Sequence, residues 1–114
     1  MSVPTLELAV QSEVTPCCGL ATASVTPEEA LRLAPLFRAL ADPVRLRLAS
    51  MIAASPEVCV CELTPAFELS PATISHHLRV LREAGLVESD RRGTFVHYRI
   101  RHGALRDLGR LLSV

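Results

Sequence analysis

In this 114-residue chain, three pairs of a helix-capping residue and a following proline stand directly before segments with helical spacing of apolar residues. Serine, threonine and aspartate accept hydrogen bonds from the free N–H groups of a first helical turn, and proline has no N–H to leave unpaired there. The three pairs are Thr26-Pro27, Asp42-Pro43 and Ser70-Pro71. They predict helices over about residues 26–41, 43–54 and 71–83, with Pro35 expected to kink or split the first. These closely spaced helix starts favour a mainly helical fold.

A strand pattern follows the third of these helices. Gly85 supplies the left-handed residue that ends the helix. Residues 86–89, 90–93 and 94–100 then show the pattern of a strand, a turn and a second strand, and a last helix is predicted over about 103–112. Helices followed by one hairpin are the elements of a winged helix-turn-helix, a mainly α fold with a β-hairpin wing (α+β).

Composition and charge limit the classes of function. Hydrophobic residues make up 49% of the chain, enough for the core of one domain over residues 26–114, whereas residues 1–25 show no periodicity and are predicted to form an N-terminal arm. The formal net charge is zero, but residues 70–114 hold eight arginines against four acidic residues, which favours an anionic partner, nucleic acid before membrane. No stretch approaches the roughly 18 apolar residues of a membrane helix. Residues 1–31 have neither lysine nor arginine, so they do not resemble a signal peptide, and we expect a cytoplasmic protein.

The helix predicted over 71–83 has two unlike faces. Ile74, Leu78 and Leu81 fall on one side at core spacing. The other side carries small, hydroxyl-bearing and cationic side chains, which let a helix sit deep in the major groove and reach base edges. At the predicted hairpin tip, guanidinium groups can reach phosphates or a narrow minor groove. The predicted DNA contacts are Ser70, Ala72, Thr73, Ser75, His76, Arg79, Arg91 and Arg92. The alternative for each is an ordinary solvated surface, but the adjacency of helix and hairpin favours DNA binding.

Four segments resemble the ArsR/SmtB family of metal-sensing repressors. They are ALADPVRLRL over 39–48, CVCEL over 59–63, ISHHLRVLREAGLV over 74–87 and GTFVHYR over 93–99. The resemblance covers about Leu33–Leu112, in the order and with the spacing of the family. It implies a homodimer that binds a DNA operator and leaves it when a metal or metalloid ion binds. It also implies dimer contacts from leucines of the first and last helices: Leu33, Leu36, Leu40, Leu105, Leu108 and Leu112.

Four cysteines supply the candidate sensing site. In a cytoplasmic chain, cysteines are typical of metal or redox chemistry rather than of a disulfide framework. Cys59 and Cys61 stand where the family places a Cys-Val-Cys sensing motif, at the start of a short helix predicted over about 61–67, and a helix N-terminus lowers thiol pKa. Two thiolates cannot complete the coordination of one soft ion, and Cys17 and Cys18 in the arm offer the missing donors. The predicted metal ligands are therefore Cys17, Cys18 and one or both of Cys59 and Cys61, with Cys59 preferred as the third.

As(III) or Sb(III), soft ions that take three thiolates, are the predicted inducers. The adjacent pair Cys17-Cys18 resembles arsenical-responsive members of the family from actinobacteria. The usual arsenical site of the family has a third cysteine three residues beyond its CxC motif, where this chain has Thr64, so the third donor is assigned to the arm. Whether the arm reaches its own subunit or a partner, and which operator is bound, stays open.

Other functions are alternatives to this prediction. Four thiolates could enclose Cd(II), Pb(II) or Zn(II) instead, and the same cysteines could form disulfides in a redox-sensing repressor. The zinc site that other members carry on the last helix is not expected, because His102 and Asp107 alone do not make its pattern. An enzyme is not expected either, because neither Cys17 nor Cys59 is followed by the glycine-rich, arginine-ended loop of a thiol arsenate reductase.

Overall fold

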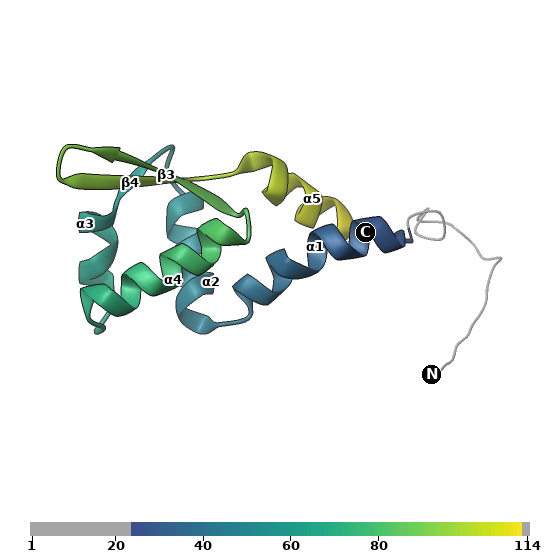
Figure 1. Ribbon diagram of the computed structural model, residues 1–114, viewed down its shortest axis with the longest axis horizontal. Coiled ribbons are helices and arrows are strands. Elements are labelled where there is room, and N and C mark those ends of the chain that lie inside the picture. The colour runs from purple at the N-terminus through teal and green to yellow at the C-terminus, as the bar shows by residue number, and fades with distance from the viewer. Residues whose placement is uncertain (1–23, 113–114) are drawn as a thin grey trace.

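The computed structural model describes residues 24–112, and Figure 1 shows the arrangement of their elements. In chain order they are α1 (Pro27–Leu40), α2 (Pro43–Ala53), β2 (Val58–Cys59), α3 (Val60–Leu63), the 3-10 turn η3 (Thr64–Ala66), α4 (Pro71–Glu83), β3 (Val87–Arg92), β4 (Phe95–Ile100) and α5 (His102–Leu112). The predicted fold class, a mainly α winged helix-turn-helix with a β-hairpin, is confirmed.

The pairs Thr26-Pro27, Asp42-Pro43 and Ser70-Pro71 each begin a helix, as predicted. At α1 the Thr26 Oγ1 atom accepts the Glu29 N–H at 3.1 Å, and the Glu29 carboxylate accepts the Thr26 N–H at 3.0 Å. Asp42 caps α2 through two backbone N–H groups, and Ser70 caps α4. Each cap satisfies donors that have no partner within the helix. These local bonds explain why the starts of the helices were predictable.

Of the two outcomes expected at Pro35, a kink or a split, the split is wrong, because α1 runs through Pro35 as one helix. A proline removes one hydrogen bond within the helix. Leu33 and Leu36, on either side of it, are 6% and 5% exposed and bury the same face of α1 against the rest of the chain. Packing on both sides of the proline therefore holds the helix together.

The hairpin belongs to a three-stranded antiparallel sheet of order β2-β4-β3. Strand β2 pairs with β4, with Cys59 opposite His97, and was not predicted. The predicted turn over 90–93 is also wrong, because β3 continues to Arg92, which pairs with Phe95. The two-residue loop begins at Gly93, whose φ of +65° is easy only for glycine. Arg91 and Arg92 therefore lie in a strand and not at the tip.

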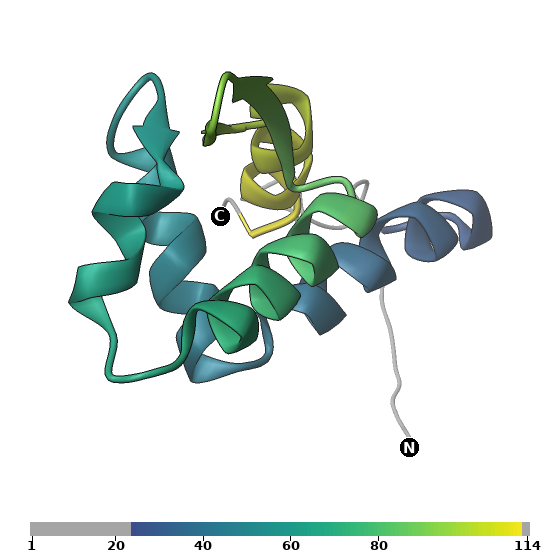
Figure 2. The same cartoon turned by 60° about the vertical axis from the view of Figure 1, so that its left-hand side comes forward.

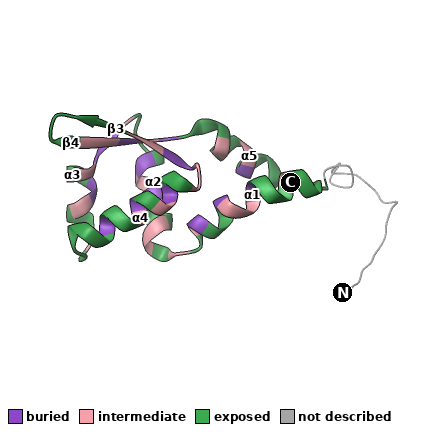
Figure 3. Cartoon of the chain, in the orientation of Figure 1, coloured by how far each residue is buried: buried purple, intermediate pink, exposed green. Residues whose placement is uncertain are grey.

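The core forms where α2, α4 and the sheet face one another, and Figure 3 marks the buried residues of these elements in purple. Leu48 and Ile52 of α2 meet the Ile74, Leu78 and Leu81 side of α4, and all five are fully buried. The predicted inner face of α4 is therefore confirmed. Helix α1 adds contacts to α2, α4 and α5. None of the described helices is long and apolar enough to cross a membrane.

Helices α1 and α5 pack together at one end of the molecule, and α3 and the hairpin tip lie at the other end (Figure 1). Of the leucines expected at a dimer contact, Leu33, Leu36 and Leu108 are buried within the chain itself. Leu105 and Leu112 are 42% and 65% exposed. The first three therefore belong to the core of one subunit, because their side chains are already covered by it.

Candidate DNA-binding groove and thiol site

A groove of about 550 Å³ runs between α4 and the hairpin. Because the apolar side of α4 packs inward, its opposite side is left to form one wall, and the strands form the other. Figure 2 brings forward the end of the molecule that carries α3 and the hairpin tip. The residues that line the groove are Ala72, Ser75, His76, Arg79 and Arg82 from α4 and Ser89, Arg91, Val96 and Tyr98 from the strands. The groove thus brings together Ala72, Ser75, His76, Arg79 and Arg91, five of the predicted DNA contacts.

Ser70 and Thr73 lie at the N-terminus of α4, outside the lining of the groove. The Ser70 Oγ atom accepts the Thr73 N–H at 3.2 Å and lies 2.9 Å from the Thr73 hydroxyl oxygen. Both residues are exposed; the Ser70 hydroxyl caps α4, and the Thr73 hydroxyl lies beside it.

Sequence reasoning missed Arg82, which lies three residues beyond Arg79 on the same side of α4. It also missed Ser89, whose position in the groove depends on the register of β3. The helical spacing could have identified Arg82. No local signal in the sequence fixes the register that places Ser89.

The groove is cationic. Three arginines line it, and no aspartate or glutamate is among the lining residues. Within residues 24–112 the salt bridges involve other arginines, and none includes Arg79, Arg82 or Arg91. Unpaired guanidinium groups on the walls of a groove create a positive potential there. The groove therefore suits an anionic ligand.

Arg91 and Arg92 point to opposite faces of the sheet, because side chains alternate along a strand. Arg91 lines the groove. Arg92 lies on the outer face, where its Nη1 donates to Glu57 Oε1 at 2.8 Å and its Nε donates to Asp90 Oδ2 at 3.1 Å. The hydrogen bond from Arg92 holds the pKa of Glu57 below its usual value, and the two carboxylates raise the pKa of Arg92.

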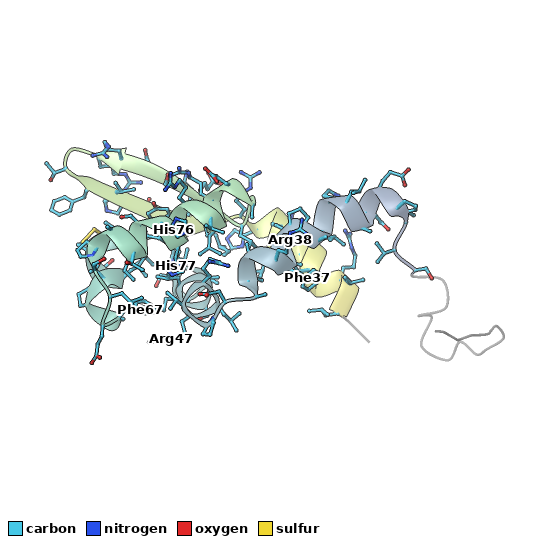
Figure 4. The ribbon with its side chains drawn as sticks, turned by 60° about the horizontal axis from the view of Figure 1, so that its bottom comes forward. Phe37, Arg38, Arg47, Phe67, His76 and His77 are labelled. Atoms are coloured by element: carbon cyan, nitrogen blue, oxygen red, sulfur yellow. A yellow bond between two sulfur atoms is a disulfide. The ribbon has the colours of Figure 1, made fainter. Side chains whose placement is uncertain are left out.

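The thiol groups of Cys59 and Cys61 converge at the start of α3. The two sulfur atoms form a disulfide in the structure, seen as a yellow bond in Figure 4, and the Cα atoms lie 5.1 Å apart. Cys59 is 8% exposed, and its sulfur accepts the Cys61 N–H at 3.2 Å. The Glu62 carboxylate accepts the Cys59 N–H at 2.9 Å and completes the cap of α3. Cys61 is exposed. In the dithiol state the two sulfurs are close enough to bind one ion.

His97 lies directly across the strand pair from Cys59, on the same face of the sheet. Its Nδ1 atom is buried and has no hydrogen-bond partner among the described residues. Within residues 24–112, no group of three or more His, Cys, Asp and Glu side chains is placed to hold a metal ion. The other two predicted ligands, Cys17 and Cys18, lie outside the described residues.

His77, next to the groove residue His76, has a structural position (Figure 4). Arg45 Nη1 lies 3.2 Å from His77 Nδ1, and the Asp42 carboxylate is 4.0 Å from the same atom. Backbone hydrogen bonding, chiefly from Arg45, and the nearby positive charges hold the pKa of Asp42 below its usual value. His77 therefore ties α4 to the start of α2.

Comparison with known proteins identifies the family. Residues 42–89 match the family described as bacterial regulatory protein, arsR family. The arsenic resistance transcriptional regulator ArsR1 of Pseudomonas putida is 51% identical over 65 residues, which cover 57% of this chain and 51% of that protein. A cadmium resistance transcriptional regulatory protein CadC homolog of Staphylococcus aureus is 38% identical over 66 residues, 58% of this chain and 54% of that protein. The chain thus spans about half the length of these curated relatives.

A solved structure extends the similarity to most of the described residues. The crystal structure of the AntR antimony-specific transcriptional repressor is 35% identical, with a TM-score of 0.62, and the match covers 77% of this chain and 82% of that one. These proteins are transcription regulators and not enzymes. The similarity in sequence and fold shows that this chain belongs to the arsR family of bacterial regulatory proteins.

Proposed function

We propose that this protein is a transcriptional repressor that binds a DNA operator as a homodimer and is released when As(III) or Sb(III) binds its cysteine thiolates. The observation that carries the DNA-binding part is the groove beside α4, which has no acidic lining residue and three arginines that make no ion pair within residues 24–112. Small and hydroxyl-bearing side chains at Ala72 and Ser75 let α4 approach base edges, and His76 adds a hydrogen-bonding group.

The homodimer is supported by exposed apolar side chains on the paired helices α1 and α5. Leu31 is 80% exposed and Leu112 is 65% exposed, and both lie on helices that already pack against each other. Large apolar side chains gathered in one region favour burial against a partner. A two-fold dimer presents two copies of α4, which would read two half-sites about one helical turn of DNA apart.

The proposed effector follows from the donor set. Trivalent arsenic forms three bonds to sulfur: As(OH)₃ and three thiols give three As–S bonds, and each hydroxide leaves as water with a thiol proton. The sulfurs would come from Cys17 and Cys18 of the arm and from one or both of Cys59 and Cys61, which converge at the start of α3. The exposed side chain of Cys61 makes it easier to reach than Cys59, which is 8% exposed.

The arm is proposed to reach the CxC motif of the partner subunit. Only six peptide units separate Cys18 from Ser24, the first described residue, and they span at most about 22 Å when extended. Ser24 lies beside the start of α1, at the end of the molecule opposite α3 (Figure 1). A dimer formed through α1 and α5 gives the arm a second CxC motif as its target.

The test uses a DNA duplex selected by the protein from a random pool and fluorescence anisotropy in reducing buffer. Arsenite is expected to weaken binding by about 150-fold, which corresponds to a coupling free energy of about 3 kcal/mol. Serine at Cys17 and Cys18 together should abolish release and leave DNA affinity intact. A normal arsenite response in that double variant would refute the role of the arm, and a wild-type response to cadmium but not arsenite would favour the Cd(II)/Pb(II) alternative.

A second candidate function, thiol redox sensing, is favoured by the disulfide between Cys59 and Cys61. One thiolate would attack hydrogen peroxide to give a sulfenic acid, with hydroxide leaving and taking up the proton that the thiol had released, as water; the second thiol would then displace water from the sulfenic acid to form the disulfide. Peroxide should then release the wild-type protein from DNA without any metalloid, and Cys61→Ser should prevent this. If peroxide leaves DNA binding unchanged, this alternative is refuted.

A further inference from the structure

An ion-pair cluster joins the segment that carries the CxC motif to the hairpin. Glu57 precedes β2 and stands two residues before Cys59. Both of its carboxylate oxygens accept hydrogen bonds from the Arg92 guanidinium, Oε1 from Nη1 at 2.8 Å and Oε2 from Nη2. A bidentate pair fixes the orientation of both side chains, not only their distance. The pair is therefore a directional link between the two segments.

This link spans strands that are not neighbours. In the order β2-β4-β3, the strand β4 separates β2 from β3. Because adjacent strands lie about 4.8 Å apart, the two outer strands are about 10 Å apart. Strand β2 has only two residues, Val58 and Cys59, so its backbone offers few hydrogen bonds to the sheet. The side chains of Glu57 and Arg92 add a contact directly from the CxC segment to the last residue of β3.

The position of Arg92 also fixes that of Arg91. Successive side chains of a strand point to opposite faces, so an Arg92 held on the outer face leaves Arg91 on the groove face. The Arg99 guanidinium lies 3.6 Å from the same Glu57 carboxylate. The Nε–H of Arg92 donates to the Asp90 carboxylate. A second cation beside Glu57 and a second anion beside Arg92 therefore hold the pair in place.

We infer that Glu57 and Arg92 form a clamp that couples the CxC motif to the DNA-facing side of the hairpin. In this role Arg92 is a positioning residue that acts through Arg91, and it does not contact DNA as the sequence suggested. An ion bound by Cys59 and Cys61 moves the segment that begins at Glu57, and the clamp transmits this movement to the end of β3. The inference rests on the proposed function for its consequence on DNA, but the coupling within the protein stands without it.

The clamp is partly solvated, which makes it testable. The side chains of Arg92 and Glu57 are 50% and 28% exposed, and ion pairs at such sites contribute little to the free energy of folding. Variants of either residue should therefore fold. If the pair had only a structural role, its loss would change the stability of the hairpin. If the pair is a clamp, its loss changes how the hairpin responds to ion binding at the CxC motif.

The experiment loads the CxC motif with a probe that needs no third donor. Phenylarsine oxide condenses with two thiols: two As–S bonds form, and the oxide oxygen leaves as water with the two thiol protons. The reduced full-length chain is used with serine at Cys17 and Cys18, so that only Cys59 and Cys61 react. Amide chemical shifts at Gly93 and Thr94, in the hairpin loop, are measured by NMR before and after loading.

In this serine background, loading is expected to shift the loop amides, and Glu57→Gln should reduce those shifts at least about threefold while the α3 amides still respond. Arg92→Lys, which keeps the charge but loses the bidentate geometry, should behave in the same way. Glu28→Gln makes the same change of charge in the first turn of α1 and should leave the shifts intact. Two results would overturn the inference. One is equal loop shifts with and without Glu57→Gln, and the other is no loop shift on loading the serine background in which Glu57 and Arg92 are intact.

A second readout separates this inference from the proposed function. This readout uses the wild-type cysteines and the selected duplex. Without arsenite, Glu57→Gln should change DNA affinity by no more than about threefold. The factor by which arsenite weakens DNA binding should be at least about tenfold smaller in Glu57→Gln than in the wild type. If wild-type protein binds no DNA or ignores arsenite, the proposed function fails, and the loop shifts still decide whether the clamp exists.

Discussion

The three arginines of the groove make the salt dependence of DNA binding a quantitative test. Arg79, Arg82 and Arg91 make no ion pair within the described residues, so each is free to neutralise a phosphate. A dimer then neutralises roughly six phosphates, and affinity should fall by about 2,000-fold between about 50 and 200 mM salt. Arg91→Ala removes two of these contacts per dimer, so the same change of salt should weaken binding by only about 150-fold.

The assay is fluorescence anisotropy on the selected duplex at five or more salt concentrations, with log affinity plotted against log salt. The slope should change from about −5.4 for the wild type to about −3.6 for Arg91→Ala. Arg106→Ala is the matched control, because Arg106 is exposed on α5, away from the groove, and its loss should leave the slope unchanged. An unchanged slope in Arg91→Ala, or an equal change in Arg106→Ala, would refute the assignment of the groove.

Three further predictions concern stability. Leu48→Ala empties a fully buried position of α2 and should cost about 3 kcal/mol in urea unfolding, and a loss below about 1 kcal/mol would show that the core there collapses to fill the space. Gly85→Ala should cost about 1 kcal/mol, because φ is +90° at this position and no atom lies within 4 Å of an added Cβ, so strain in the backbone is the whole effect. The pKa of Asp42 is held below its usual value of 3.8 in the folded state, so the stability from its ionised form is present above that value and is lost as pH falls. Asp42→Asn should therefore flatten the acid limb of a plot of stability against pH, and an unchanged limb would contradict the argument.

The elements predicted correctly are those whose signals are local. The cap pairs at Thr26, Asp42 and Ser70 lie within three residues of the N–H groups they satisfy, and the core side of α4 follows from helical spacing. Strand β2 was missed because two residues carry no pattern of their own, and Val58 and Cys59 become a strand only by pairing with β4, almost forty residues later. The site depends on such non-local pairing.

The hairpin shows how a small local error changes a functional assignment. Placing the turn at 90–93 put Arg91 and Arg92 together at a tip, whereas the loop at Gly93 puts them in a strand with opposite orientations. One arginine then faces the groove and the other meets Glu57, a partner that no sequence spacing reveals. Of the α4 residues predicted to contact DNA, Ala72, Ser75, His76 and Arg79 line the groove, because a helix sets its faces without help from distant segments.

The two cysteines of the CxC motif differ in how easily evolution can replace them with other residues. Cys59 is buried and its sulfur caps α3, so a replacement there must also hold the Cys61 N–H. Cys61 is exposed, and its side chain accepts none of the capping bonds. Mutation at position 61 can therefore change how hard or soft the donor atoms of the ion site are, or how many there are, without removing a capping hydrogen bond of α3. A change of effector is then accessible by single substitutions at one position, while the neighbouring position keeps the fold.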